Sequence, residues 1–298
     1  MTTPRTWWDL ASFSYLAHAQ VLHVTRYPGA NQGAEVNWTA SSLAADGPLV
    51  ARACAQAGLR TALVANRTGS DPTGRWTTSA LNAAGVHHPA DGVHAPRRTP
   101  QLTVVTDDAG TRTWFADLTH AYAGLHQADT APLAHARLAY VDGYTVIAEA
   151  AAEALRTASA AGTPVLLNLG GDLVHAKLRD AARQARLHVV QTSVPEARSP
   201  DAVQIAHALL DDLQPEAAVV TMGALGAVAV TRTGRQHMPA DRVDVVHTHG
   251  AGAAFSAELA AAHLRGEDLT TALHRACAAG TAHCAASPSP TVRERTAS

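Results

Sequence analysis

The sequence predicts an α/β protein with a mainly parallel sheet that is covered by helices on both faces. The first observation is that, after residue 45, short β-branched runs alternate with helical patterns. Such alternation is typical of a parallel sheet packed on both faces. The second observation is that two polar, β-like segments, 11–40 and 94–116, interrupt the alternation. We therefore expect one domain, 1–298, built as a three-layer α/β/α sandwich with a small second sheet standing off it.

The first elements after residue 45 carry recognisable start and stop signals. A helix is predicted over Gly47–Ala57, and a strand follows over Thr61–Ala65. The next helix begins at Asp71 and Pro72, because aspartate caps a helix and proline is tolerated at its first position. Gly85 ends that helix.

The rest of the chain continues the alternation and ends in a polar tail. Strands are predicted at Leu138–Val141, Pro164–Leu169, Leu187–Gln191, Ala217–Thr221 and Gly226–Thr231. Helices are predicted near Ala148–Ala161, Val174–Ala185 and Pro200–Leu213, with two more towards the C-terminus. Thr103–Phe115 is expected to form a hairpin around the turn Asp107–Gly110. The Pro- and Ser-rich segment 287–298 is expected to be a flexible tail. In a sheet of this kind, ligands bind at the carboxyl ends of the strands.

Composition favours a cytoplasmic protein without nucleic-acid or membrane partners. The 298 residues are 47% hydrophobic, which is enough for a sizeable core. A formal net charge of −2 gives no electrostatic reason to expect nucleic acid or an anionic membrane. No apolar run is long enough to span a bilayer, and the N-terminus lacks a signal-peptide core. Cys54, Cys277 and Cys284 stand singly in Ala-rich helical patterns, as expected in a reducing cytosol.

The most informative segment is a glycine-rich turn late in the chain. Residues 247–255, HTHGAGAAF, follow the apolar run Val243–Val246 and open an Ala-rich helical pattern. Backbone N–H groups converge at a helix N-terminus, where the helix dipole also favours negative charge. We therefore expect the N–H groups of Ala251, Gly252 and Ala253 to line an anion site.

A second glycine-rich loop, Thr221–Ala227, lies between two predicted strands. Glycine lets the backbone approach a ligand closely, although the same pattern also fits an ordinary tight turn. Together with the later glycine-rich turn, this loop favours a nucleotide site. A dinucleotide-binding Rossmann motif is excluded, because the third glycine position is Phe255 and the motif stands near the end of the chain.

The glycine-rich turn resembles the signature D-T-x-G-A-G-D-x-F of the PfkB, or ribokinase-like, carbohydrate kinases. The chain keeps Thr248, Gly250, Ala251, Gly252 and Phe255 of that signature. Further similarity covers most of the chain, in Asp46-Gly47 to Gly58, Gly69-x-Asp71-x-x-Gly74 and Asp108-x-Gly110-x-Arg112-Thr113-Trp114-Phe115. The resemblance implies a ribokinase-like fold, with 11–40 and 94–116 as a lid that covers the sugar site and often builds a homodimer contact. It also implies ATP and Mg²⁺ as cofactors and a small sugar- or nucleoside-like substrate.

The resemblance assigns expected roles on the nucleotide side of the site. Thr221, Gly223 and Gly226 correspond to a loop that lies against the phosphates and ribose of the nucleotide. Glu196 corresponds to a glutamate that helps to hold magnesium through water. Ser193 replaces the asparagine that precedes this glutamate in the family, and its hydroxyl still offers a ligand.

On the substrate side, Asp9, Asp46 and Gly47 fall where the family contacts substrate hydroxyls. A carboxylate that accepts hydrogen bonds from vicinal hydroxyls orients a sugar and gives specificity. Leu49 occupies a position where relatives often have a substrate-binding asparagine, and Asn168 ends a strand where many relatives carry an acid. We therefore expect the substrate to differ from those of typical relatives.

Two departures from the signature concern the reaction itself. His247 and Ala253 stand where the family has aspartates, and the second aspartate is the general base that takes the proton from the substrate hydroxyl. Alanine cannot accept a proton, and loss of a general base typically costs about 10²–10⁴ in rate. We therefore expect a diverged enzyme that is a poor kinase. Two alternatives are a genuine kinase inactivated by an Asp-to-Ala substitution and a non-catalytic ligand-binding protein.

The histidines of the turn are further candidates for acid–base chemistry. If the reaction has changed, we expect His247 or His249 to act as acid or base, because imidazole titrates near neutrality. A histidine metal site is disfavoured. Zinc needs three or four ligands in a defined geometry, and no cysteine or aspartate is spaced to complete such a set.

Overall fold

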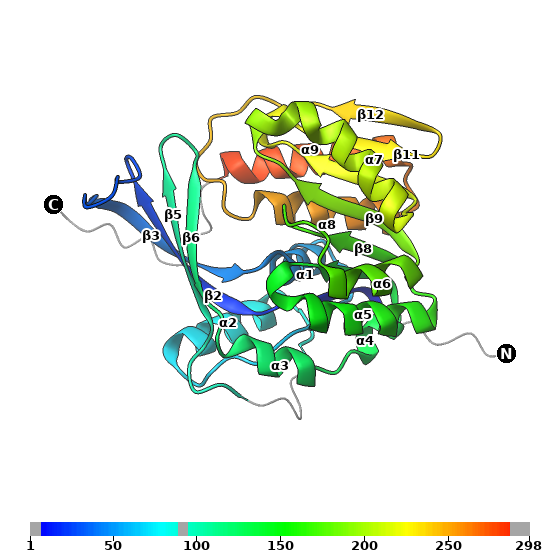
Figure 1. Cartoon of the computed structure of the whole chain (residues 1–298). Coiled ribbons are helices and arrows are strands. Elements are labelled where there is room, and N and C mark those ends of the chain that lie inside the picture. Colours follow the sequence, from blue (N-terminus) through cyan, green and yellow to red (C-terminus); the bar gives the residue numbers. More distant parts are fainter. Residues whose placement is uncertain (1–6, 89–94, 287–298) are drawn as a thin grey trace.

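The computed structural model describes residues 7–88 and 95–286, which form two sheets and their covering helices (Figure 1). The main sheet has eight strands in the order β12-β11-β10-β9-β8-β7-β1-β4. These strands are β1 (Trp8–Phe13), β4 (Thr61–Val64), β7 (Ala136–Asp142), β8 (Val165–Asn168), β9 (Leu187–Ser193), β10 (Ala217–Thr221), β11 (Ala227–Thr231) and β12 (Gly234–Met238). Neighbours from β4 to β10 pair in parallel, whereas β11 and β12 are antiparallel at one edge. The prediction of a mainly parallel sheet is confirmed.

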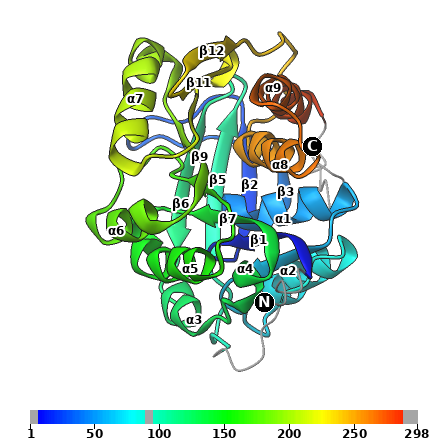
Figure 2. The same ribbon diagram turned by 90° about the vertical axis from the view of Figure 1, so that its right-hand side faces the viewer.

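Helices cover both faces of the main sheet (Figure 2). One apolar core contains residues of α1 (Asp46–Gln56), α2 (Pro72–Ala83), α8 (Ala251–Leu264) and α9 (Leu269–Ala285). The other contains residues of α3 (Ala121–Gln127), α4 (Ala131–Ala134), α5 (Ala148–Ala161), α6 (Ala176–Gln184) and α7 (Ala202–Leu213). The strands β4 and β8 are buried along their whole length, as expected for strands covered on both faces. The three-layer α/β/α arrangement is therefore confirmed.

The small sheet has four strands in the order β3-β2-β5-β6 and stands to one side of the main sheet (Figure 1). Its strands are β2 (Ala17–Val24), β3 (Val36–Ala44), β5 (Gln101–Asp107) and β6 (Arg112–Asp117). The predicted hairpin is confirmed, since β5 and β6 pair antiparallel. Its turn is held by the Asp107 carboxylate, which accepts from the backbone N–H and the hydroxyl of Thr111 at 2.9 and 2.7 Å.

The boundaries of the small sheet differ from those expected. Residues 11–13 belong to β1, which lies between β7 and the edge strand β4 of the main sheet, and β3 continues to Ala44 beyond the expected end at residue 40. Polar Ser12 made this part of the sequence look like a surface strand. Its hydroxyl is in fact buried and donates to the carbonyl oxygen of Gly47 at 2.9 Å. Residue 94 and the predicted tail 287–298 lie outside the described residues.

Local signals explain most helix ends. The Asp71 carboxylate accepts from the N–H of Gly74 at 2.8 Å and so caps α2 as predicted. Helix α5 ends at Gly162, which has a φ of 70°. Helix α7 begins later than predicted, because Pro200 lies in a preceding 3₁₀ turn, Glu196–Asp201. Within residues 7–88 and 95–286, no helix is both long and apolar enough to cross a membrane.

Candidate functional site

The carboxyl ends of the parallel strands meet on the side of the main sheet from which the small sheet extends. The connection is short, since only residues 14–16 separate the end of β1 from the start of β2. The register places Asp142 beside Asn168 on β7 and β8, and Ser193 beside Thr221 on β9 and β10. Four of the polar positions that could face a ligand thus come from adjacent strand ends.

The glycine-rich turn forms the N-terminus of α8. Gly250 is the N-cap residue, with a φ of 91°, a conformation that favours glycine. The N–H of Ala251 donates to the carbonyl oxygen of Thr248 at 3.3 Å. Among the described residues, the N–H groups of Gly252 and Ala253 have no acceptor. A Cβ atom built on Gly252 would meet nothing within 4 Å, so the turn opens to a space in front of these two donors.

Ala253, in the first turn of α8, is buried. The residue is 1% exposed and belongs to the core beneath α1, α8 and α9. One turn further along α8, the buried Ser256 hydroxyl lies 3.0 Å from Oε1 of Gln191 on β9 and 2.9 Å from the carbonyl oxygen of Gly252. These contacts hold the first turn of α8 against the sheet. The side chain at position 253 is therefore held in a fixed place and is apolar.

Both histidines of the turn have a lowered pKa, and that of His249 is lowered furthest below neutrality. Burial and the nearby Arg112 guanidinium lower the pKa of His249 to about 3, and its Nε2 atom is buried without a hydrogen-bond partner. Burial and the neighbouring His283 ring also lower the pKa of His247. An efficient general base needs a pKa near the working pH. Among the described residues, no three His, Cys, Asp or Glu side chains form a group that could hold a metal ion.

The structure brings together the two loops expected on the nucleotide side. Oε1 of Glu196 accepts from the N–H of Ala224 at 2.9 Å, next to Gly223, which has a φ of 58°. Gly226 is required by packing, since a Cβ atom there would lie 2.0 Å from the carbonyl oxygen of Met238. The Thr221 hydroxyl donates to the carbonyl oxygen of Thr192. Within the described chain Oε2 of Glu196 accepts no hydrogen bond, so this atom is available to a water bound to Mg²⁺.

An acidic cluster lies at the other end of this edge. Asp46, the first residue of α1, accepts from the Tyr144 hydroxyl at 2.8 Å and from Nδ2 of Asn168 at 3.0 Å. Asp142, at the end of β7, accepts from the same Asn168 amide at 2.9 Å and from the Tyr140 hydroxyl at 3.0 Å. Its second oxygen accepts from the N–H of Gly47 at 2.7 Å. One amide group therefore bridges two carboxyl groups.

The electrostatics of this acidic cluster follow from burial and from its two like charges. Burial and the charge of Asp46 raise the pKa of Asp142 to about 7. Burial and the charge of Asp142 also raise the pKa values of Tyr140 and Tyr144 well above their ordinary range. Both phenols therefore remain hydrogen-bond donors at neutral pH.

The backbone leading into α1 is adapted to this site. Ala45 has a φ of 70° and a ψ of 158°, a conformation that is costly for any residue except glycine. A Cβ atom on Gly47 would lie 2.5 Å from Cβ of Ser14, so only glycine fits against the end of β1. Asp46 and Gly47 were both expected on the substrate side. The backbone conformation of Ala45 and the close approach of Gly47 to Ser14 place both residues in the acidic cluster.

Asp9 lies elsewhere. It is near the start of β1, at the edge of the sheet opposite the strand ends described above. Its carboxylate accepts from the backbone N–H and the guanidinium of Arg60, and it forms an ion pair with Arg137. The structure therefore does not bring Asp9 together with Asp46 and Gly47; it holds Asp9 in an ion-pair network at the opposite edge of the sheet.

Sequence reasoning missed Asp142, Tyr140 and Tyr144. Asp142 carried a usable signal, since an acidic residue directly follows the predicted strand Leu138–Val141, at the end where ligands bind. The two tyrosines carried no such sequence signal, because their hydrogen bonds in the acidic cluster depend on the pairing of β7 with β8.

Two contacts join the acidic cluster, the turn and the small sheet. Cδ1 of Leu49, one turn after Asp46 on α1, lies 3.6 Å from a Cβ built on Gly250. The hydroxyl of Thr248 lies 3.4 Å from the carbonyl oxygen of Gly110, at the tip of the β5–β6 hairpin. The small sheet therefore reaches over the edge and touches the loop before α8, as a lid over a site would.

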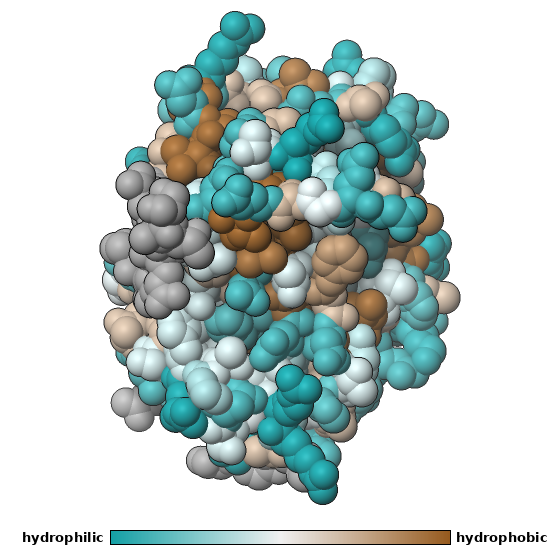
Figure 3. Space-filling model, turned by 90° about the vertical axis from the view of Figure 1, so that its left-hand side faces the viewer, coloured by the Kyte–Doolittle hydropathy of each residue, from teal (hydrophilic) through white to brown (hydrophobic). Residues whose placement is uncertain are grey.

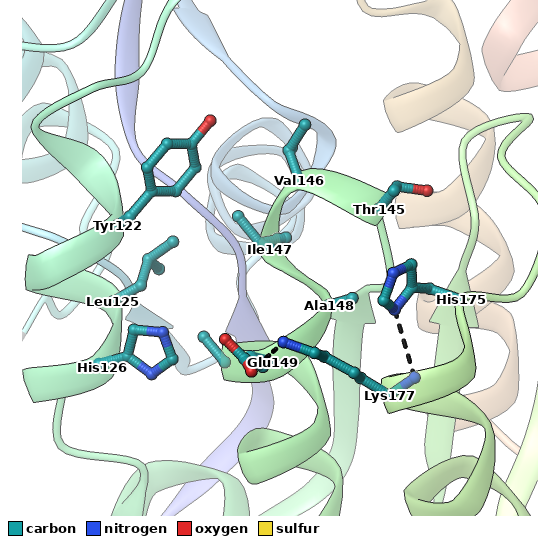
Figure 4. A pocket seen from close by; sticks show the side chains of 11 residues that line it. Tyr122, Leu125, His126, Thr145, Val146, Ile147, Ala148, Glu149, His175 and Lys177 are labelled. Carbon is teal, nitrogen blue, oxygen red and sulfur yellow. Dashed lines mark hydrogen bonds and ion pairs between the residues drawn. The ribbon is translucent and has the colours of Figure 1, made fainter.

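A separate pocket of about 260 Å³ lies beside the cluster, between α3 and the start of α5 (Figure 4). Its wall includes Thr145, Val146 and Ile147, which directly follow Tyr144. Glu149 forms an ion pair with Lys177 across the pocket (Figure 4). None of the residues that the sequence predicted for the site lines it.

Comparison with known proteins gives consistent matches over most of the chain. The model of the pfkB family of carbohydrate kinases matches residues 49–289. A solved structure of a microbiome-derived acarbose kinase has a TM-score of 0.77 and 21% sequence identity, covering 96% of this chain and 95% of that one. An E. coli protein named as a ribokinase II, in complex with ATP and Mg²⁺, has a TM-score of 0.74 and 16% identity, covering 94% and 93%. These structures establish the ribokinase-like fold.

A curated relative matches over a short segment only. The aminoimidazole riboside kinase of Salmonella typhimurium is 48% identical to this chain over 52 residues. The match covers 17% of this chain and 16% of that protein.

Proposed function

Because this chain belongs to the pfkB family of carbohydrate kinases, we propose that it binds ATP with Mg²⁺ and a small sugar- or nucleoside-like molecule, and that it transfers phosphate only slowly. The observation that carries this proposal is the first turn of α8. It presents two free N–H donors to an open space, and it carries the buried methyl group of Ala253, which by resemblance to the family signature corresponds to the general base. The same turn would thus keep the backbone donors that bind a phosphate and lack the carboxylate that accepts a proton.

The residues present suit a nucleotide with its metal ion. The N–H groups of Gly252 and Ala253 would donate to phosphate oxygens, helped by the positive end of the α8 dipole. The loop around Gly223 would lie beside the rest of the nucleotide, and Glu196 would hold the metal through water. When bound, Mg²⁺ neutralises charge on the transferring phosphoryl group.

The substrate would bind at the acidic cluster. Asp46 is half-buried and lies at the end of α1 that adjoins the α8 turn through Leu49. Its carboxylate would accept hydrogen bonds from the substrate, while Tyr144 and Asn168 keep it oriented. The β5–β6 hairpin would cover the bound molecule and limit the access of water.

Restoring the missing carboxylate is the direct test. We expect purified protein to show very slow ATP-dependent phosphorylation of candidate sugars and nucleosides, and Ala253→Asp to raise the rate by about 10²–10⁴. A matched control is Ala254→Asp, which adds the same charge at the neighbouring, half-buried position. Phosphate transfer is followed by ADP release. Rapid turnover by the unaltered chain would contradict the proposal.

The same experiment distinguishes a slow kinase from a non-catalytic ligand-binding protein. If Ala253→Asp binds ATP and a sugar but remains as slow as the unaltered chain, a ligand-binding function is favoured. Binding is measured separately by calorimetry, so that loss of nucleotide affinity is not mistaken for loss of chemistry.

A further inference from the structure

The carboxyl groups of Asp46 and Asp142 share one bridging amide and have no basic partner. Every hydrogen bond that they accept comes from a neutral donor: the amide of Asn168, the hydroxyls of Tyr140 and Tyr144, and the N–H of Gly47. Among the described residues, no lysine or arginine forms an ion pair with either carboxylate. Two adjacent carboxylates away from water are unstable unless a proton or a cation compensates one charge.

A buried hydroxyl beside the pair also lacks a partner. The Ser14 side chain is fully buried, its Oγ atom has no partner at normal hydrogen-bond geometry, and its hydroxyl interacts with Asp142 and helps to lower the pKa of that carboxyl. Within the described chain, Oδ1 of Asp46 accepts no hydrogen bond either, and Asp46 is partly exposed. Unused acceptors thus remain at a site that solvent reaches from one side. A buried polar group of this kind is usually paired in the functional state.

We infer that the Asp46–Asp142 pair recognises a protonated amino group on the substrate. The inference rests on the proposed function and narrows its substrate class to amino sugars or other polyols that carry an amine. An ammonium group brings three donors and a full positive charge, whereas a hydroxyl brings one donor and no charge. A metal ion is a poorer fit, because no group of three metal-binding side chains occurs in the described residues.

The groups that surround the pair do not titrate in the range that matters. Burial raises the pKa values of Tyr15, Tyr140 and Tyr144, so all three stay neutral between pH 6 and 9. Arg112, on the small sheet, acts on Tyr15 and lies over the ring of Trp114. Asp142 is therefore the group whose protonation a bound cation would change.

Calorimetry with matched ligands tests the inference. The probes are D-glucosamine, D-galactosamine and D-mannosamine, each compared with its parent hexose and its N-acetyl derivative, which remove the charge. We expect at least one amine to bind ten times more tightly than both uncharged counterparts at pH 7. Because a cation lowers the pKa of Asp142, its binding should release a proton. Heats measured in buffers of different ionisation enthalpy report that release.

Substitutions test whether Asp46 and Asp142 cause the preference for an amine. Asp46→Asn and Asp142→Asn should each remove the preference for the amine and abolish the proton release. Two variants are used because either one could disturb folding, which is checked by thermal unfolding. Asp9→Asn is the matched control, since it makes the same chemical change in an ion pair at the opposite edge of the sheet. This variant should keep the preference.

The outcomes separate this inference from the proposed function. If no amine binds at least ten times more tightly than its counterparts, or if binding releases no proton, the inference is overturned. ATP binding and slow phosphate transfer to neutral sugars would then still support the kinase proposal. Conversely, amine binding that depends on Asp46 and Asp142 without any ATP binding would support the inference and contradict the kinase proposal.

Discussion

The carboxyl group of Asp142 is fully buried beside Asp46, and its environment has a consequence for stability. Burial and the charge of Asp46 raise its pKa from 3.8 to about 7 in the folded protein. Between these values the folded state binds more protons than the unfolded chain. The free energy of unfolding should therefore fall as the pH rises from about 4 to about 7.

Replacing this carboxyl group should flatten that pH dependence. We expect Asp142→Asn to lose less stability than the unaltered protein between pH 5 and pH 8, measured by urea unfolding. Asp9→Asn serves as the comparison. Burial raises the pKa of Asp9, but hydrogen bonds from Arg60 outweigh this effect and lower it, so this residue stabilises the protein above its pKa. The interpretation of Asp142 is contradicted if the unaltered protein and Asp142→Asn show the same change between the two pH values.

At the N-terminus of α8, a single substitution should remove ligand binding without affecting folding. Gly252 is exposed, has no need for a positive φ, and would place a side chain in open space. Gly252→Val should therefore leave the melting temperature nearly unchanged while blocking the approach of a phosphate to the N–H groups of the turn. We expect at least a tenfold loss of ATP affinity by calorimetry. Gly234→Val, at another open glycine on β12, is the control and should keep that affinity.

Comparison of the predicted and observed strands and helices shows which part of the site the sequence could predict. Strand and helix alternation was enough for the main sheet, and the glycine-rich turn was correctly placed at a helix N-terminus. The polar cluster was only half predicted. Asp46 and Gly47 could be named from a motif, but Asp142 and the two tyrosines meet them only when the chain folds, because Gly47 and Asp142 are 95 residues apart in the sequence. Asp9 was also named from a motif, and a motif does not tell that this residue lies near the start of β1, at the opposite edge of the sheet from Asp46 and Gly47.

The whole molecule leaves one edge of its small sheet uncovered. Strand β6 is at the edge of the order β3-β2-β5-β6, and nearly all of its residues are exposed. Trp114 and Phe115 on this strand are 57% and 58% exposed. Apolar side chains also interrupt the hydrophilic surface on the side of the molecule where the small sheet lies (Figure 3). An exposed apolar edge strand invites pairing with another chain.

We therefore propose that two copies of the chain associate through their small sheets, with β6 and its aromatic side chains in the contact. Analytical ultracentrifugation should show a dimer at micromolar concentration, because pairing of the two β6 edges would satisfy their backbone groups and bury the exposed aromatic side chains of both copies. Phe115→Lys should shift the protein towards monomer, since a charged side chain on an edge strand opposes pairing.

Leu173→Lys is the matched control, as Leu173 is 89% exposed in the loop before α6, outside the small sheet. A monomer in the unaltered protein would contradict the proposed dimer, and a dimer that Phe115→Lys leaves intact would place the contact elsewhere. Because the β5–β6 hairpin also touches Thr248, dimer formation would hold the lid against the α8 turn, and Phe115→Lys should weaken ATP binding as well.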